Sequence, residues 1–136
     1  MRAESKRRAR ALQLLYALEA VPSESPEVAF RGLARLTGPE PGILEEARAV
    51  VDGVLARRDE LDRLAQAAAD NWRLERIATI ERNILRLGVQ ELLVGVTPVK
   101  VVLDESVWLA QRFAGERAPA FINGVLDRVA RSLGRL

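Results

Sequence analysis

Residues 80–94 read IERNILRLGVQELLV, and this stretch decides the fold. Its apolar residues recur at steps of three and four, which is the period of a helix that buries a broad face. They are Ile80, Ile84, Leu85, Leu87, Leu92 and Leu93, with Gly88 among them. Arg82, Arg86 and Gln90 follow one another at intervals of four, so we expect them on the polar side. The stretch has no proline and predicts the central core helix.

Outward from this stretch the same period returns on both sides, interrupted by proline and glycine. Six of the predicted helices cover residues 2–20, 27–37, 43–57, 80–94, 99–114 and 120–134. A further helix follows Asp59, with Leu61, Leu64, Ala65 and Ala68 on one face. Ser25, Asp59 and Thr79 are the expected N-caps, and Gly95 ends the central helix. In the loop at 71–73 we expect Trp72 to fill a gap between helices. No segment has the pattern of a strand, so the fold class is all-α with about seven helices.

The composition excludes several kinds of active site. The 136 residues include no cysteine and no histidine, which removes thiolate sites, the commonest metal ligand and every Ser-His-Asp triad. No glycine-rich phosphate loop is present. Asp104 and Glu105 are adjacent on a helix and diverge by about 100°, so we interpret them as solvated charges rather than a catalytic pair. We expect a binding protein with no catalytic residue, no metal and no cofactor.

The charge is unevenly distributed although its net value is only +2. Both ends of the chain are basic and the middle is acidic. On a helical wheel Lys6, Arg10 and Gln13 fall within about 60° of one another, with Tyr16 beside them. Such a cluster can bind phosphates while the tyrosine stacks a base, which is typical of proteins that bind single-stranded RNA. The alternative is a solubilising basic arm with a half-buried tyrosine.

The N-terminus has no long apolar run, so we expect neither a signal peptide nor a transmembrane segment. The expected location is the cytoplasm.

Four blocks of sequence, in this order, resemble the NusB family of bacterial transcription antitermination factors. The blocks are RRARALQLLYALEA at 7–20, LARRDELDRLAQAAADNW at 55–72, IERNILRLGVQELL at 80–93 and PVKVVLDESVWLAQRFAGERAPAFINGVLDRVAR at 98–131. Together they span nearly the whole chain. The most specific part is FINGVLD at 121–127, which follows the AQRFAG segment.

The resemblance implies a single non-enzymatic RNA-binding domain over 1–136. It implies two small packed bundles, an N-terminal one over about 1–75 and a C-terminal one over about 76–136. The implied partners are boxA RNA of ribosomal RNA operons, ribosomal protein S10 (NusE) and the antitermination complex on RNA polymerase. The residues that we expect to bind RNA are Lys6, Arg7, Arg8, Arg10, Gln13, Tyr16, Phe121 and Asn123. The residues that we expect to contact the protein partner are Glu81 and Arg82.

Two features leave alternatives open. Many relatives carry an acidic-Ser-basic stretch before the F-x-N-G motif. This chain reads Glu116, Arg117, Ala118, Pro119, Ala120 there and is one residue shorter, so the resemblance does not extend to RNA contacts from this loop. Helical periodicity also permits a purely protein-binding scaffold or a homodimer with a non-specific basic arm. A methyltransferase fused to such a module does not fit, because this chain has no cysteine to attack cytosine.

Overall fold

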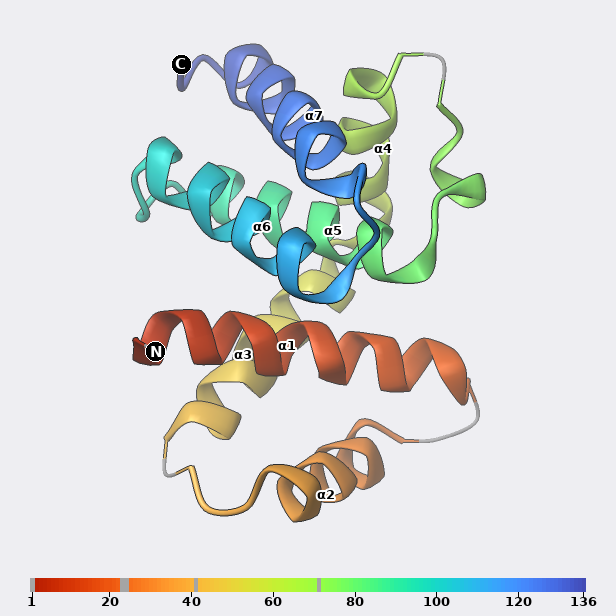
Figure 1. Ribbon diagram of the computed structural model, residues 1–136, viewed down its shortest axis with the longest axis vertical. Helices are drawn as coiled ribbons and strands as arrows, with labels where there is room; N and C mark the ends of the chain where they lie inside the picture. The colour runs from red at the N-terminus through yellow and green to blue at the C-terminus, as the bar shows by residue number, and fades with distance from the viewer. Residues whose placement is uncertain (1, 23–24, 41, 71) are drawn as a thin grey trace.

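The computed structural model describes residues 2–22, 25–40, 42–70 and 72–136, which form seven α-helices and no strand (Figure 1). The helices are α1 (Ala3–Ala20), α2 (Pro26–Thr37), α3 (Ile43–Ala56), α4 (Arg58–Ala68), the short 3₁₀ helix η1 (Leu74–Arg76), α5 (Thr79–Val94), α6 (Val99–Phe113) and α7 (Ala118–Ser132). The all-α prediction is confirmed. Residue 71 of the expected loop lies outside the described residues.

The helices are arranged in two groups, with α1, α2 and α3 in the lower half of Figure 1 and α4 to α7 in the upper half. The resemblance implies a division near residue 75; in the structure α4 packs against α5 and α7 of the upper group. Helix α1 packs against both α3 and α5. Because buried side chains from both groups form one hydrophobic core, the two groups share their interior.

The central helix α5 is the most deeply buried element, as the sequence predicts. Its fully buried side chains are Ile84, Leu85, Val89 and Leu92. At Gly88 a Cβ atom would lie 2.7 Å from Leu126 Cδ1 of α7 and 3.2 Å from Ser106 Oγ of α6. The absence of a side chain there lets both neighbouring helices approach α5 closely.

The prediction that Arg86 lies on the polar side of α5 is wrong, because this residue is only 8 % exposed. Its guanidinium is buried because carboxylates from two other helices, Glu19 of α1 and Asp62 of α4, bind it. Arg82 and Gln90 are half-buried rather than solvated.

Helix ends agree only partly with the expected caps. Ser25 Oγ accepts a hydrogen bond from Val28 N at 3.2 Å, and Gly95 is left-handed with φ 77°, so both of these predictions are confirmed. Asp59 and Thr79 are not N-caps. Only Arg57 separates α3 from α4, which leaves Asp59 inside the first turn, and Thr79 is itself the first residue of α5.

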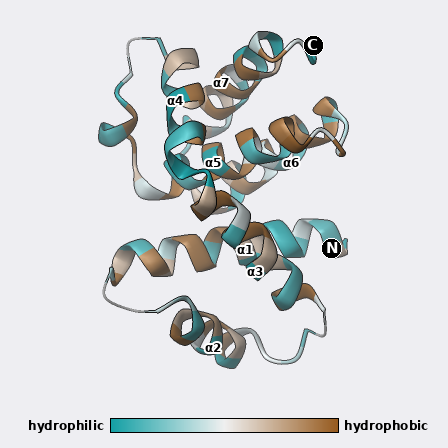
Figure 2. Ribbon diagram, turned by 180° about the vertical axis from the view of Figure 1, so that it is seen from behind, coloured by the Kyte–Doolittle hydropathy of each residue, from teal (hydrophilic) through white to brown (hydrophobic). Residues whose placement is uncertain are grey.

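Two further side chains depart from expectation. Trp72 does not fill an interior gap but is 62 % exposed, because its loop turns outward from the end of α4. Glu105 is buried instead of solvated, since it accepts hydrogen bonds from Ser5 and Arg8 of α1. Asp104 is exposed as expected and pairs with Lys100 at 3.3 Å. Figure 2 shows the polar beginning of α1 in teal and its later apolar turns in brown.

Candidate nucleic-acid interface

The basic beginning of α1 supplies most of the residues predicted to bind RNA. Arg10 donates two hydrogen bonds to Glu40, from Nε at 2.8 Å and from Nη2 at 3.2 Å, and a third to Gln13 Oε1 at 2.8 Å. Arg7 Nη1 donates to Glu46 Oε2 at 2.9 Å. Both arginines are half-buried at the rim of the N-terminal group. Their charges are therefore partly neutralised by the chain itself.

Glu40 lies in the connection between α2 and α3, close to the basic cluster. The hydrogen bond from Arg10 holds the pKa of this carboxyl below its ordinary value, and the charges of Arg10 and Lys6 lower it further. The charges of Lys6 and Arg10 thus both act on the carboxylate of Glu40. An RNA phosphate that binds here must share or displace Glu40.

Arg8 is placed differently from its neighbours, with only 7 % of its surface exposed. Its Nε and Nη2 donate to the two carboxylate oxygens of Glu91 at 2.9 and 2.7 Å, and Nη1 lies 3.4 Å from Glu105 Oε1. Burial disfavours the charge of Arg8, but the hydrogen bonds and charges of these carboxylates outweigh it and raise the guanidinium pKa above its ordinary value. Arg8 therefore joins α1 to α5 and α6 and does not face solvent.

Tyr16 lies two turns beyond Arg10 on α1 and is 47 % exposed. It lines a shallow hollow together with Thr79 and Ile80 of α5 and Phe113 at the end of α6. The tyrosine ring is therefore next to the C-terminal group of helices, whereas Arg7 and Arg10 pair with the N-terminal group.

Phe121 lies in the first turns of α7 and is half-buried. Its ring makes an edge contact with Trp72, with centroids 5.7 Å apart and planes inclined at 66°. Both rings line a cleft of about 510 Å³ whose walls include Arg76 and Arg117. Asn123 is exposed but does not line this cleft, because two residues along a helix turn a side chain by about 200°.

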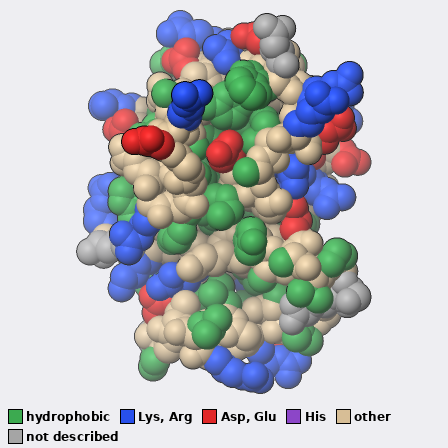
Figure 3. Space-filling view, turned by 45° about the vertical axis from the view of Figure 1, so that its right-hand side comes forward, with side chains coloured by type: hydrophobic (Ala, Val, Ile, Leu, Met, Phe, Trp, Pro, Cys, Tyr) green, Lys and Arg blue, Asp and Glu red, His purple; other side chains and the backbone are tan. Residues whose placement is uncertain are grey.

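The cleft and the hollow meet, since Ala78, Glu81 and Gly115 line both. We call the two together the aromatic groove. Tyr16 flanks one end and Phe121 the other, with Glu81 between them. The face that Figure 3 turns forward has hydrophobic side chains gathered in its middle and Lys and Arg mostly at its edges. The structure thus brings together three of the residues predicted from the sequence, from three different helices.

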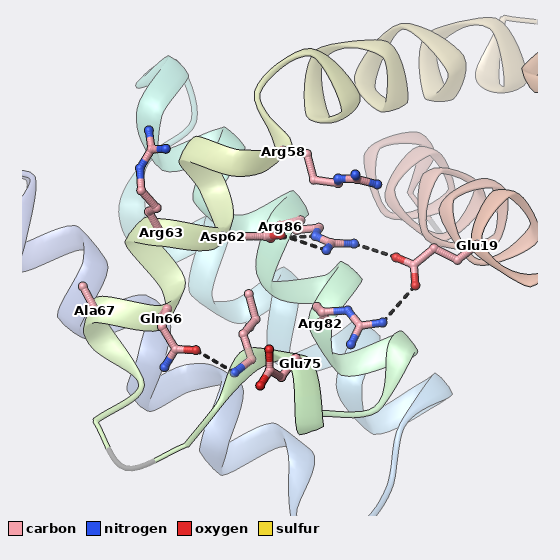
Figure 4. Close-up of a pocket in the computed structure, with 10 residues that line it drawn as sticks. Glu19, Arg58, Asp62, Arg63, Gln66, Ala67, Glu75, Arg82 and Arg86 are labelled. Atoms are coloured by element: carbon pink, nitrogen blue, oxygen red, sulfur yellow. Dashed lines mark hydrogen bonds and ion pairs between the residues drawn. The ribbon is translucent and has the colours of Figure 1, made fainter. Parts of the chain in front are cut away.

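Arg82, which we predicted beside Glu81 as a partner contact, faces a second cleft of about 830 Å³ (Figure 4). There Arg82 donates to Glu19 at 2.9 Å, and Arg86 donates to Glu19 at 2.6 Å and to both oxygens of Asp62 at 2.7 and 2.9 Å. Burial alone would raise the pKa of Glu19, but the hydrogen bonds and charges of both arginines outweigh it and lower that pKa. Arg82 and Glu81 therefore belong to different surfaces.

Three residues of the aromatic groove were missed by the sequence analysis: Trp72, Arg76 and Arg117. Trp72 was assigned to the interior. A signal was available, because Trp72 is followed closely by Arg73 and Arg76, and surfaces that bind single-stranded nucleic acid combine aromatic side chains with basic ones. Within the described ranges no group of three or more Asp, Glu, His or Cys side chains is placed to hold a metal ion. No described helix has both the length and the hydrophobicity needed to cross a membrane.

The sequence profile of the NusB family matches residues 5–131. The transcription antitermination protein NusB of Myxococcus xanthus is 42 % identical over 132 residues, which cover 94 % of this chain and 94 % of that protein. The corresponding protein of Sorangium cellulosum is 44 % identical, covering 100 % of this chain and 97 % of its own length. A solved structure of antitermination factors NusB and NusE in complex with double-stranded RNA contains a chain that superposes with a TM-score of 0.84 at 28 % identity, covering 97 % of this chain and 98 % of that one.

Proposed function

This chain belongs to the NusB family, and from that membership we propose that it is a non-enzymatic transcription antitermination factor that binds boxA RNA together with ribosomal protein S10 (NusE). The RNA-binding part of the proposal rests on the aromatic groove between Tyr16 and Phe121. Tyr16 lies on α1, the helix that begins with the basic cluster of Lys6, Arg7 and Arg10. Exposed aromatic rings beside arginines match the recognition of unpaired bases. Action on nascent RNA places the protein in the cytoplasm.

The groove and the basic cluster have separate roles in this proposal. Lys6, Arg7 and Arg10 contact phosphates, and Gln13 orients Arg10 through its side-chain hydrogen bond. Tyr16 and Phe121 contact bases and supply preference for boxA over other sequences. Asn123, exposed on α7, donates to RNA outside the groove.

S10 binds next to the RNA in this proposal, with Glu81 in the groove as its contact. Arg82 acts through the cleft of Figure 4, where it fixes Glu19 at the end of α1. The pair of proteins joins the antitermination complex on RNA polymerase. If bound S10 tightens the binding of RNA, bound RNA must tighten the binding of S10 by the same factor, because the two binding equilibria are linked.

The test is fluorescence-anisotropy titration of a boxA-like single-stranded RNA and its scrambled control, with and without S10, at two salt concentrations. We expect S10 to tighten boxA binding and the preference for boxA to persist at the higher salt. Equal binding of both RNAs, lost together as salt rises and unaffected by S10, would overturn the proposal and leave a non-specific basic arm.

The variants are chosen to keep the fold intact. Removing residues 1–10 would also remove the buried Arg8, so a double variant Arg7→Ala/Arg10→Ala replaces that truncation. The double variant should weaken the binding of boxA RNA and scrambled RNA alike, while Tyr16→Ala should lower the preference for boxA RNA over scrambled RNA. Lys100→Ala, which removes an exposed cation on α6, is the matched control and should change neither.

A further inference from the structure

The indole of Trp72 is 62 % exposed at the mouth of the aromatic groove. Large aromatic side chains on a protein surface commonly mark binding sites, because leaving their apolar area in water is unfavourable. We propose that Trp72 stacks on a nucleobase of the bound RNA, and that this base is additional to the bases that contact Tyr16 and Phe121. This inference rests on the proposed function and deepens it.

The loop that carries Trp72 is held in place by one side chain of α4. Gln66 Nε2 donates to the Trp72 carbonyl oxygen at 2.6 Å. Gln66 Oε1 accepts from Leu74 N at 2.7 Å, the bond dashed at Gln66 in Figure 4. The Trp72 amide also donates to Ala69 O at 3.1 Å. These hydrogen bonds hold the backbone of Trp72 and Leu74 before any ligand arrives, which reduces the entropy lost on binding.

The two rings at this end of the groove offer distinct faces. Because the planes of Trp72 and Phe121 are inclined at 66°, one flat ligand cannot lie parallel to both. Phe121 is half-buried and Trp72 is mostly exposed, so the indole has the larger free surface. Successive bases of a single strand can each stack on one ring.

The cleft beside Trp72 offers two cations to a nucleic acid. Arg76 and Arg117 line it together with the carboxylates of Glu81 and Glu116, and neither arginine takes part in an ion pair within the described part of the chain. Each guanidinium can contact a phosphate or stack on a base. The cleft also continues into the hollow at Tyr16, along the proposed path of the RNA.

The experiment compares Trp72→Ala, Trp72→Phe and Trp108→Phe with the unchanged chain by anisotropy titration of boxA-like RNA, without S10. Trp108, the only other tryptophan, lines a different hollow, so Trp108→Phe is the matched control and leaves Trp72 as the sole indole fluorophore. We expect Trp72→Ala to weaken binding at least about fivefold, the lower end of what a stacked base contributes. Trp72→Phe should keep most of the affinity, and RNA should quench the fluorescence of Trp108→Phe.

A second series identifies the stacked base. RNAs with one abasic nucleotide at each position in turn are titrated against the unchanged chain and Trp72→Ala. At one position, the abasic nucleotide should weaken RNA binding by the unchanged chain but should not weaken RNA binding by Trp72→Ala further, because both changes remove the same contact. The slope of log affinity against log salt should stay the same in Trp72→Ala, since stacking releases no counterion.

The outcomes separate this inference from the proposed function. If the unchanged chain prefers boxA RNA and Trp72→Ala binds it equally well, the stacking role is wrong and the proposed function stands. If a parallel titration with S10 shows that Trp72→Ala loses affinity only for S10, Trp72 is a protein contact and the inference is overturned. If the unchanged chain shows no preference for boxA, the proposed function fails and this inference fails with it.

Discussion

Arg8 of α1 and Glu91 of α5 form a two-point ion pair, with Nε–Oε2 and Nη2–Oε1 distances of 2.9 and 2.7 Å. The pair joins the helix with the basic cluster to the central helix of the core. Arg8 thus contributes to positioning α1, the helix of the candidate RNA-binding surface, although its position in the sequence groups it with the predicted phosphate contacts.

We predict that Arg8→Ala lowers the free energy of unfolding by about 3 kcal/mol, because it removes the buried guanidinium that pairs with both Glu91 and the buried Glu105. Under conditions in which Arg8→Ala is folded, it should bind RNA with an unchanged slope of log affinity against log salt. Arg7→Ala, the control, should cost less than about 1 kcal/mol and make the slope shallower by about 0.7. Denaturant unfolding and salt-dependent RNA titration measure these effects. A shallower slope for folded Arg8→Ala would show that Arg8 does reach a phosphate.

Glu40→Gln should tighten RNA binding about threefold, because Arg10 no longer has an internal carboxylate that competes with phosphate. The increase should be similar for boxA and scrambled RNA, since phosphate contacts carry no sequence information. Glu45→Gln, an exposed acidic residue in the first turn of α3, is the control for the change in net charge. Weaker binding by Glu40→Gln would mean instead that Glu40 orients Arg10 toward the RNA.

The Glu19 network should make stability depend on acid pH. The folded-state pKa of Glu19 lies below the ordinary value of 4.5, so its pairing with Arg82 and Arg86 stabilises the fold at pH values above 4.5. That contribution is lost as pH falls through the lower, folded-state pKa. The difference in unfolding free energy between the unchanged chain and Glu19→Gln should therefore be largest near neutral pH and shrink below about pH 4.5. Urea unfolding at several pH values measures it. Glu60→Gln, which removes an exposed carboxylate of α4, is the control for the loss of one negative charge.

Gly88→Ala should destabilise the protein by about 1–3 kcal/mol, because its Cβ would lie 2.7 Å from a side-chain atom of fully buried Leu126. Gly124→Ala in α7 is the matched control, since its Cβ would meet nothing closer than 3.8 Å. That change should be neutral or stabilise by up to about 1 kcal/mol through helix propensity. Thermal and denaturant unfolding of both variants test the close approach of α5 to α7, and equal stabilities would contradict it.

Hydrophobic periodicity predicted the fold well because each helix here has its own apolar face. The central helix was predicted to begin at Ile80 and begins at Thr79, and both ends of the helix over 43–57 were right to within one residue. Resemblance to the NusB family, carried by blocks such as FINGVLD, is confirmed by the match over residues 5–131. The last helix begins at Ala118 rather than at residue 120, because Pro119 fits the first turn of a helix as well as a loop.

The pairing of charges could not be predicted from the sequence. Arg86 and Glu105 have the spacing of polar-face residues, and their burial depends on partners that lie on other helices. Trp72 shows the opposite error, since hydrophobicity alone assigns a tryptophan to the interior. The residues of the candidate site stay predictions, but Tyr16, Phe121 and Glu81 line one groove, which periodicity could not show.

The walls of the aromatic groove come from distant parts of the chain: Tyr16 from α1, Trp72 from the loop after α4 and Phe121 from α7. During synthesis α1 leaves the ribosome before α7, and a domain generally folds as a unit. Because both helix groups share one core, the groove can form only after Phe121 has been made. In the proposed function, the basic residues of α1 are therefore made early and the surface proposed to contact bases is completed late in synthesis.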